Sequence, residues 1–106
     1  MSTDAVFRAL ADSSRRKLLD RLYQLNGQTL GDLCKGLAMT RPAVAKHLRI
    51  LENANLVAVH WQGRKKHHYL NSVPIHEIAE RWIRKFDRKP LSMLHELKRR
   101  LEGQES

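Results

Sequence analysis

The chain has 106 residues, 42% of them hydrophobic, and its 20 Lys and Arg residues against 11 Asp and Glu residues give a net charge of +9 at pH 7. This length allows one domain with a small core, while the single cysteine, Cys34, excludes an internal disulfide and any multi-cysteine zinc site. No apolar stretch approaches the roughly 20 residues of a membrane span, and the start lacks the features of a secretory signal, so we expect a cytoplasmic protein without membrane contact.

Two amphipathic helices are predicted before residue 27. The first covers 3–12 and the second 13–26, which Asp12 or Ser13 can cap and which Asn26-Gly27 can end. Apolar residues recur at helical spacing in both. The first stripe consists of Val6, Phe7, Leu10 and Ala11, and the leucines expected to be buried in the second are Leu18, Leu19, Leu22 and Leu25.

A short third helix over 29–38 and a fourth over 40–53 are predicted next, joined by a tight turn. Thr29 followed by Asp32 is similar to a capping box, with Asp in place of Glu. Thr40 can cap the fourth helix, and Pro42 falls in its first turn, where a missing N–H costs nothing. This arrangement is a helix-turn-helix candidate. The fourth helix has two faces, with Val44, Leu48 and Leu51 on one and Pro42, Lys46 and Arg49 on the other.

A β-hairpin with a basic tip is predicted after the fourth helix. The segments 55–62 and 67–73 show the alternation and the β-branched or aromatic content of strands, and Gly63 is available for the turn between them. A helix-turn-helix followed by such a hairpin is a winged helix. We therefore predict a mainly α fold with one small hairpin, the wing, in the order α-α-α-α-β-β-α.

Helical spacing returns over about 74–101, where Pro90 is expected either to kink one helix or to separate two. The apolar positions are Ile75, Ile78, Ala79, Trp82, Phe86, Leu91, Leu94, Leu97 and Leu101. A stripe this apolar predicts packing against the first helix and against a second copy of the chain. Because no repeat or linker divides the sequence, we expect residues 1–106 to form one domain.

The positive charge is concentrated in the middle of the chain. Residues 41–72 carry six basic groups and one acid, Glu52, for a net charge of +5, whereas 1–40 and 73–106 carry +2 each. A local field of this sign predicts a polyanionic partner. Nucleic acid is favoured over an anionic membrane because the segment has no large amphipathic basic helix.

Three stretches of the chain carry a resemblance to a known family. ALADSSRRKLLDRL, LGDLCKGLAMTRPAVAKHLRILENANLV and GRKKHHYLN resemble the ArsR/SmtB family of bacterial winged-helix repressors, over roughly residues 3–86. The resemblance implies a homodimer that binds operator DNA. It also implies that the first and last helices (about 3–12 and 74–101) form the dimer interface and that the fourth helix enters the major groove.

The metal sites of this family are missing from the sequence. Arsenic-sensing members carry three cysteines in the helix before the recognition helix, and of these only Cys34 remains. Zinc-type members carry Asp-x-His and His-x-x-Glu on the last helix; here Pro74 stands two places before His76, and the later positions are Asp87 and Pro90. Since a closed transition-metal site needs three or four ligands, the resemblance is to the metal-independent branch. We expect no metal and no cofactor.

The expected DNA-binding residues come from the fourth helix and from the wing at 62–67. They are Thr40, Arg41, Pro42, Ala45, Lys46, His47, Arg49, Arg64, Lys65 and Lys66. Wing cations would meet phosphates or the minor groove, while Pro42 and Ala45 would let the backbone approach the bases. His47 lies at the flank of the apolar seam, where a packed histidine is at least as common as a base reader. The expected dimer-interface residues are Val6, Phe7, Leu10, Ile78, Trp82, Phe86, Leu94 and Leu97.

The sequence thus predicts a homodimeric repressor that binds an inverted-repeat operator, with no inducer specified. An alternative is a metal- or redox-responsive repressor in which Cys34, His76 or His95 joins groups of a partner chain. A third reading is a winged helix that binds protein or RNA, because fold alone does not decide function. Catalysis is disfavoured, since the chain lacks a glycine-rich phosphate loop, a nucleophile elbow and paired carboxylates in a plausible cleft.

Overall fold

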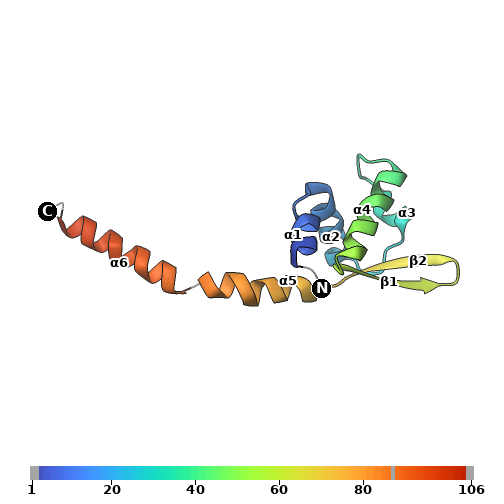
Figure 1. Ribbon diagram of the computed structural model, residues 1–106. Helices are drawn as coiled ribbons and strands as arrows, with labels where there is room; N and C mark the ends of the chain where they lie inside the picture. Colours follow the sequence, from blue (N-terminus) through green and yellow to red (C-terminus); the bar gives the residue numbers. More distant parts are fainter. Residues whose placement is uncertain (1–2, 87, 105–106) are drawn as a thin grey trace. The chain divides into compact units, whose positions relative to one another are not determined.

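The computed structural model describes residues 3–86 and 88–104, which fall into two units, one ending at Ile75 and the other beginning at His76 (Figure 1). The predicted order of helices followed by a hairpin is confirmed. The elements of the first unit are α1 Thr3–Leu10, α2 Ser13–Gln24, α3 Leu30–Cys34, α4 Arg41–Asn53, β1 Val57–Gln62 and β2 Lys65–Leu70. Then follow α5 Val73–Ile78, a π-helical segment Ala79–Ile83, a 3-10 turn Arg84–Phe86 and α6 Arg88–Gln104.

Three helix starts are determined by side-chain caps that the sequence predicted. Asp12 accepts hydrogen bonds from the backbone N–H groups of Ser14 and Arg15, at 2.8 and 3.1 Å. Thr29 and Asp32 form the reciprocal capping box at the start of α3. The Thr40 hydroxyl accepts from the Ala43 N–H, at 3.2 Å. Each cap satisfies N–H groups that the first turn leaves without a helical partner.

The core of the first unit is formed by leucines and valines from all four helices and from the start of β1. Its fully buried large side chains include Leu18, Leu22, Leu33, Val44, Leu51 and Leu56. One expectation was wrong: Leu25, which was predicted to be buried, is 66% exposed, because α2 ends at Gln24 and the backbone is extended at Leu25. On α1 the buried residues are Val6 and Ala9, while Phe7 is exposed. Ala11, the last residue of the predicted stripe, lies just beyond the end of α1 and is exposed as well.

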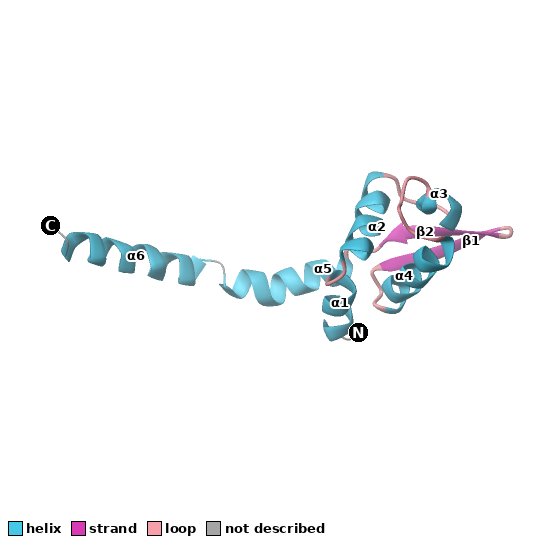
Figure 2. Cartoon of the chain, turned by 90° about the horizontal axis from the view of Figure 1, so that it is seen from above, coloured by secondary structure: helices cyan, strands magenta, loops and turns pink. Residues whose placement is uncertain are grey.

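The hairpin is antiparallel, with Val57 opposite Leu70 and Gln62 opposite Lys65. Gly63 has a positive φ of 62°, the left-handed conformation that glycine adopts without strain. His68 anchors the base: its backbone pairs with Gly27 and Gln28, and its side chain is only 3% exposed. From this base the two strands project beyond the helices (Figure 2).

The C-terminal unit is helical and exposes a row of large apolar side chains. They include Trp82, Phe86, Met93, Leu94, Leu97 and Leu101. Pro90 lies in the first turn of α6, so the helical path is divided before the proline rather than kinked at it. Asp87 and the side chain of Leu91, both named in the sequence predictions, lie outside the described part of the chain. No helix within the described ranges is long and apolar enough to cross a membrane.

Candidate nucleic-acid interface

Helix α4 has the two faces that its sequence predicted. Val44, Leu48 and Leu51 are buried against the core. On the other side Arg41, Pro42, Lys46 and Arg49 are exposed, and Ala45 between them is half-buried. The cap at Thr40 starts the helix here, so the first exposed arginine, Arg41, stands at its N-terminus. The helix therefore presents a short cationic surface whose orientation is held by the buried leucines.

The wing adds cations at its tip. Arg64 lies in the turn with Gly63, Lys65 begins β2, and both side chains are exposed. Helix α4 packs against β1, so the wing belongs to the same unit as the cationic face of α4. The exposed side chains of α4 and of the wing tip are thus carried by one packed unit.

Lys66 differs from the tip residues. Its Nζ lies 2.7 Å from Oε1 of Glu52 on α4, and the two side chains are 34% and 19% exposed. This ion pair was not anticipated from the sequence, although Glu52 stood out as the one acid among residues 41–72. It joins the last turn of α4 to the second strand of the wing.

A cleft of about 200 Å³ lies between α3, α4 and β2. Its wall combines apolar groups with charged ones, and it is lined by Leu30, Ala45, Leu48, Arg49, Glu52, Lys66 and His68. The cleft thus lies between the middle of α4 and the β2 strand of the wing. The ion pair between Glu52 and Lys66 crosses it and forms part of its lining.

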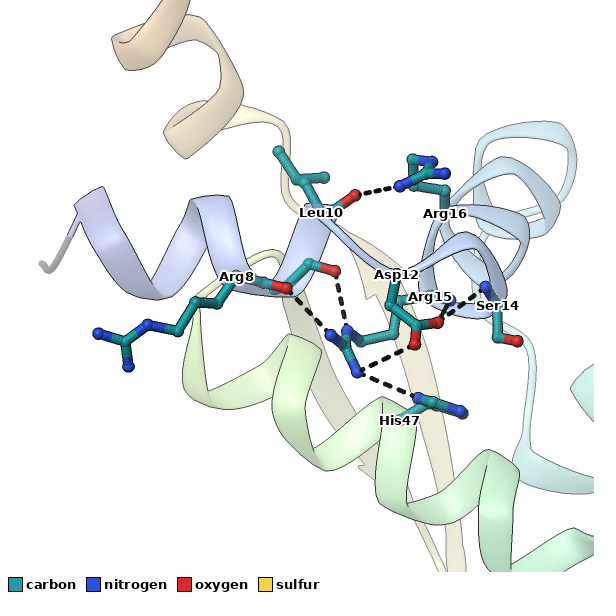
Figure 3. A network of polar contacts seen from close by, with 8 residues as sticks. Arg8, Leu10, Asp12, Ser14, Arg15, Arg16 and His47 are labelled. Atoms are coloured by element: carbon teal, nitrogen blue, oxygen red, sulfur yellow. Dashed lines mark hydrogen bonds and ion pairs between the residues drawn. The ribbon is translucent and has the colours of Figure 1, made fainter.

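His47 belongs to a polar network rather than to the exposed face of α4 (Figure 3). Its Nδ1 lies 3.3 Å from Nη1 of Arg15, and because a guanidinium can only donate, His47 is the acceptor. Arg15 also donates through Nε to the Ala9 carbonyl at 2.8 Å and through Nη2 to the Arg8 carbonyl at 3.0 Å. Arg15 on α2 thus links the C-terminal end of α1 to α4. This role of Arg15 was not predicted from the sequence; the available signal was its place three residues after the capping Asp12.

Two carboxyl groups at helix starts have shifted acidities. Hydrogen bonding from the Arg15 backbone N–H, helped by the nearby Arg15 charge, lowers the pKa of Asp12 below its ordinary value of 3.8. Hydrogen bonding from Thr29 lowers the pKa of Asp32 in the same way. Both groups cap helices at neutral pH, and neither has the raised pKa of a general acid.

The expected dimer-interface residues divide into three groups by exposure. Val6 is 3% exposed, so it belongs to the core of its own unit and is not available to a partner. Leu10 and Ile78 are half-buried, whereas Phe7, Trp82, Phe86, Leu94 and Leu97 are exposed.

The described residues provide no metal site. No group of three or more His, Cys, Asp and Glu side chains within 3–86 and 88–104 could hold an ion. Cys34 is half-buried. His68 is buried with Nδ1 2.9 Å from the Gln28 carbonyl, while its strand neighbour His67 has Nδ1 2.7 Å from the Gly27 carbonyl.

Comparisons with protein families, curated proteins and solved structures all match transcription regulators. Residues 12–59 match a family described as "Bacterial regulatory protein, arsR family". The uncharacterized HTH-type transcriptional regulator YuzN of Bacillus subtilis is 40% identical over 86 residues, covering 76% of this chain and 94% of that protein. The transcriptional repressor SdpR of Bacillus subtilis is 31% identical over 84 residues, covering 79% and 91%. Among solved structures, an ArsR-like transcriptional regulator from Rhodococcus sp. RHA1 superposes with a TM-score of 0.76 at 27% identity, covering 94% of this chain and 90% of that one.

Proposed function

The chain belongs to the ArsR family of bacterial transcription regulators, and on this premise we propose that it is a homodimeric repressor of an inverted-repeat operator. The observation that carries the proposal is the exposed cationic face of α4 within the unit that also carries the basic wing tip. Operator DNA is the polyanion that such a helix and hairpin can contact together. A regulator of this kind acts in the cytoplasm, where a bacterial chromosome lies.

The two elements are assigned different tasks. Exposed residues of α4 would enter the major groove, where Lys46 and Arg49 read base edges and the small surfaces of Pro42 and Ala45 permit close approach. Thr40 and Arg41, at the helix start, would contact the backbone. Arg64 and Lys65 of the wing would bind phosphates or the minor groove. His47 is assigned to the anchoring of α4 through Arg15.

The dimer is proposed to form through the terminal helices, about 3–12 and 74–101. Support comes from the exposed apolar side chains of α1 and of the C-terminal unit, chiefly Phe7, Trp82, Phe86, Leu94 and Leu97. Burying such a row stabilises association by roughly 25 cal/mol for each Å² removed from water. A two-fold dimer would present two copies of α4 and two wings, as an inverted repeat requires.

Selection of binding sites from random duplex DNA tests this function and identifies the operator together. We expect enrichment of an inverted repeat whose half-sites lie about one helical turn apart. Recovery of sequences without two-fold symmetry would contradict the dimeric arrangement. Failure to enrich any duplex, combined with tight binding of an RNA pool at the same salt concentration, would favour the RNA-binding reading of the winged helix.

A further inference from the structure

The ion pair between Glu52 and Lys66 places an acid inside the region that is otherwise cationic. Glu52 is the one acidic residue among 41–72, a segment with six basic residues. It occupies the last turn of α4, and its Oε1 lies 2.7 Å from the Lys66 Nζ on β2. One of the six cations is therefore neutralised by the protein itself.

The surroundings favour persistence of this pair. The Glu52 side chain is mostly buried and that of Lys66 about two-thirds buried, so salt screens their attraction less than it screens an exposed pair. If a DNA phosphate bound Lys66 instead, the Glu52 carboxylate would lose its ion-pair partner in a mostly buried position. It would also lie beside a polyanion of its own sign, and both effects are unfavourable. Arg49 lines the same cleft, but its side chain is exposed on the face of α4 that we assign to base contacts.

Strand geometry separates Lys66 from the other wing cations. Side chains alternate along β2, and Lys66 shares a face with the buried His68 and with its cross-strand partner Trp61. Lys65 pairs with Gln62 on the other face, at the turn. Lys66 is thus directed toward α4, whereas Arg64 and Lys65 belong to the tip.

We propose that Glu52 limits DNA affinity by holding Lys66 in this ion pair and thereby removing one phosphate contact per protomer. The inference rests on the proposed DNA-binding function. The sequence predicted that all three wing cations, Arg64, Lys65 and Lys66, contact DNA, whereas this proposal removes Lys66 from the contacts. Because phosphate contacts carry no base information, Glu52 sets the strength and salt dependence of binding to any duplex and leaves the preference for the operator unchanged.

The test is the salt dependence of DNA binding by charge-neutralising variants of the full chain. Glu52→Gln releases Lys66, so the slope of log affinity against log salt should steepen by about 0.9 per protomer. Between ~50 and ~200 mM salt, the loss of affinity would then grow by about 12-fold for a dimer with two added contacts. Operator and scrambled duplexes should show the same change.

Four further variants separate ion pairing from other effects. Lys66→Gln should keep the wild-type slope, whereas Arg64→Gln should make it shallower by about 0.9 per protomer. The double variant Glu52→Gln/Lys66→Gln should return to the wild-type slope. Asp20→Asn, at an exposed position of α2, removes the same charge elsewhere and should leave the slope unchanged.

Each outcome is decisive. The role of Glu52 would be overturned if Glu52→Gln left the salt slope unchanged. It would also be overturned if Lys66→Gln made the slope as much shallower as Arg64→Gln does. If Glu52→Gln folds poorly, the comparison of Lys66→Gln with Arg64→Gln still tests the proposal. If wild-type protein binds operator and scrambled duplex equally, the proposed function fails instead, independently of how the variants compare with one another.

Discussion

Arg15 shows how one side chain can determine the position of the helix that we propose to contact DNA. Its guanidinium fills the space between the end of α1, whose carbonyls of Arg8 and Ala9 it satisfies, and His47 on α4. The last carbonyls of a helix have no partner within the helix, so Arg15 does for α1 what a cap does. It also fixes α4 from the side opposite its cationic face.

Replacement of Arg15 by Ala is expected to lower the free energy of unfolding by about 1–3 kcal/mol, because carbonyls and His47 Nδ1 lose their donor in a partly buried site. Arg16→Ala is the matched control. Arg16 is exposed and donates to the single carbonyl of Leu10, so its loss should cost within about 0.5 kcal/mol. Urea unfolding followed by circular dichroism measures both, and equal losses would contradict the linking role of Arg15.

Acid should destabilise the fold through Asp12 and Asp32. Both pKa values are lowered in the folded state by hydrogen bonds, so the unfolded chain binds more protons as the pH falls. The stability from these groups is present above their ordinary value of 3.8 and is lost as the pH falls through the lower folded-state pKa. In the double variant Asp12→Asn/Asp32→Asn, unfolding free energies measured from about pH 6 to about pH 2.5 should depend less on pH. An undiminished pH dependence would show that other carboxyl groups cause the acid loss.

At the scale of elements, the features predicted correctly from the sequence were the local ones. The caps at Asp12, Thr29 and Thr40, the position of Pro42 and the glycine turn of the wing involve residues within a few positions of one another, and all were predicted. The exposure of Leu25 was missed because it depends on where α2 stops. The contacts of Lys66 with Glu52 and of Arg15 with His47 join residues 14 and 32 positions apart, and sequence periodicity carries no information on such pairs.

The C-terminal end of α4 offers a test of backbone conformation at a position without glycine. Asn55 has a φ of 61°, and its N–H donates to the Glu52 carbonyl while that of Leu56 donates to the Leu51 carbonyl, the two bonds of a Schellman motif. Both Asn55→Ala and Asn55→Gly remove the amide side chain, so their difference isolates the backbone. We expect the Ala variant to unfold about 1–2 kcal/mol more easily than the Gly variant in thermal denaturation. Equal stability would mean that the left-handed turn is not required.

At the scale of the whole molecule, two units divide the work that we propose. The unit ending at Ile75 holds the cationic α4 and the wing, while the unit beginning at His76 carries exposed apolar side chains. Both surfaces could be predicted from the sequence, the first by counting charges along the chain and the second from the spacing of apolar residues. Neither prediction requires knowledge of contacts between distant residues. The pattern did not predict that the helical stretch after Ile78 changes to a π-helical and then a 3-10 segment before α6.

The dimer can be tested on α6 without changing the first unit. Leu94→Glu/Leu97→Glu places two charges in the exposed apolar row, and we expect light scattering to show a monomer and DNA binding to weaken. The control, Ser92→Glu/Arg99→Glu, alters the opposite side of the same helix and should remain dimeric. A dimer that survives the leucine substitutions, or is lost equally in both variants, would contradict the assignment of this row to the interface.

The central claim, that α4 reads sequence while the wing binds phosphate, is tested most directly by anisotropy titrations of two variants against operator and scrambled duplexes across a salt series. Arg49→Ala should reduce the preference for the operator by about 1–3 kcal/mol per bidentate contact. Arg64→Ala should weaken binding to both duplexes alike and make the salt slope shallower by about 0.9 per protomer, with the preference retained. If both variants lose affinity equally for both duplexes, the cationic face of α4 is a general polyanion surface and the proposed readout is wrong.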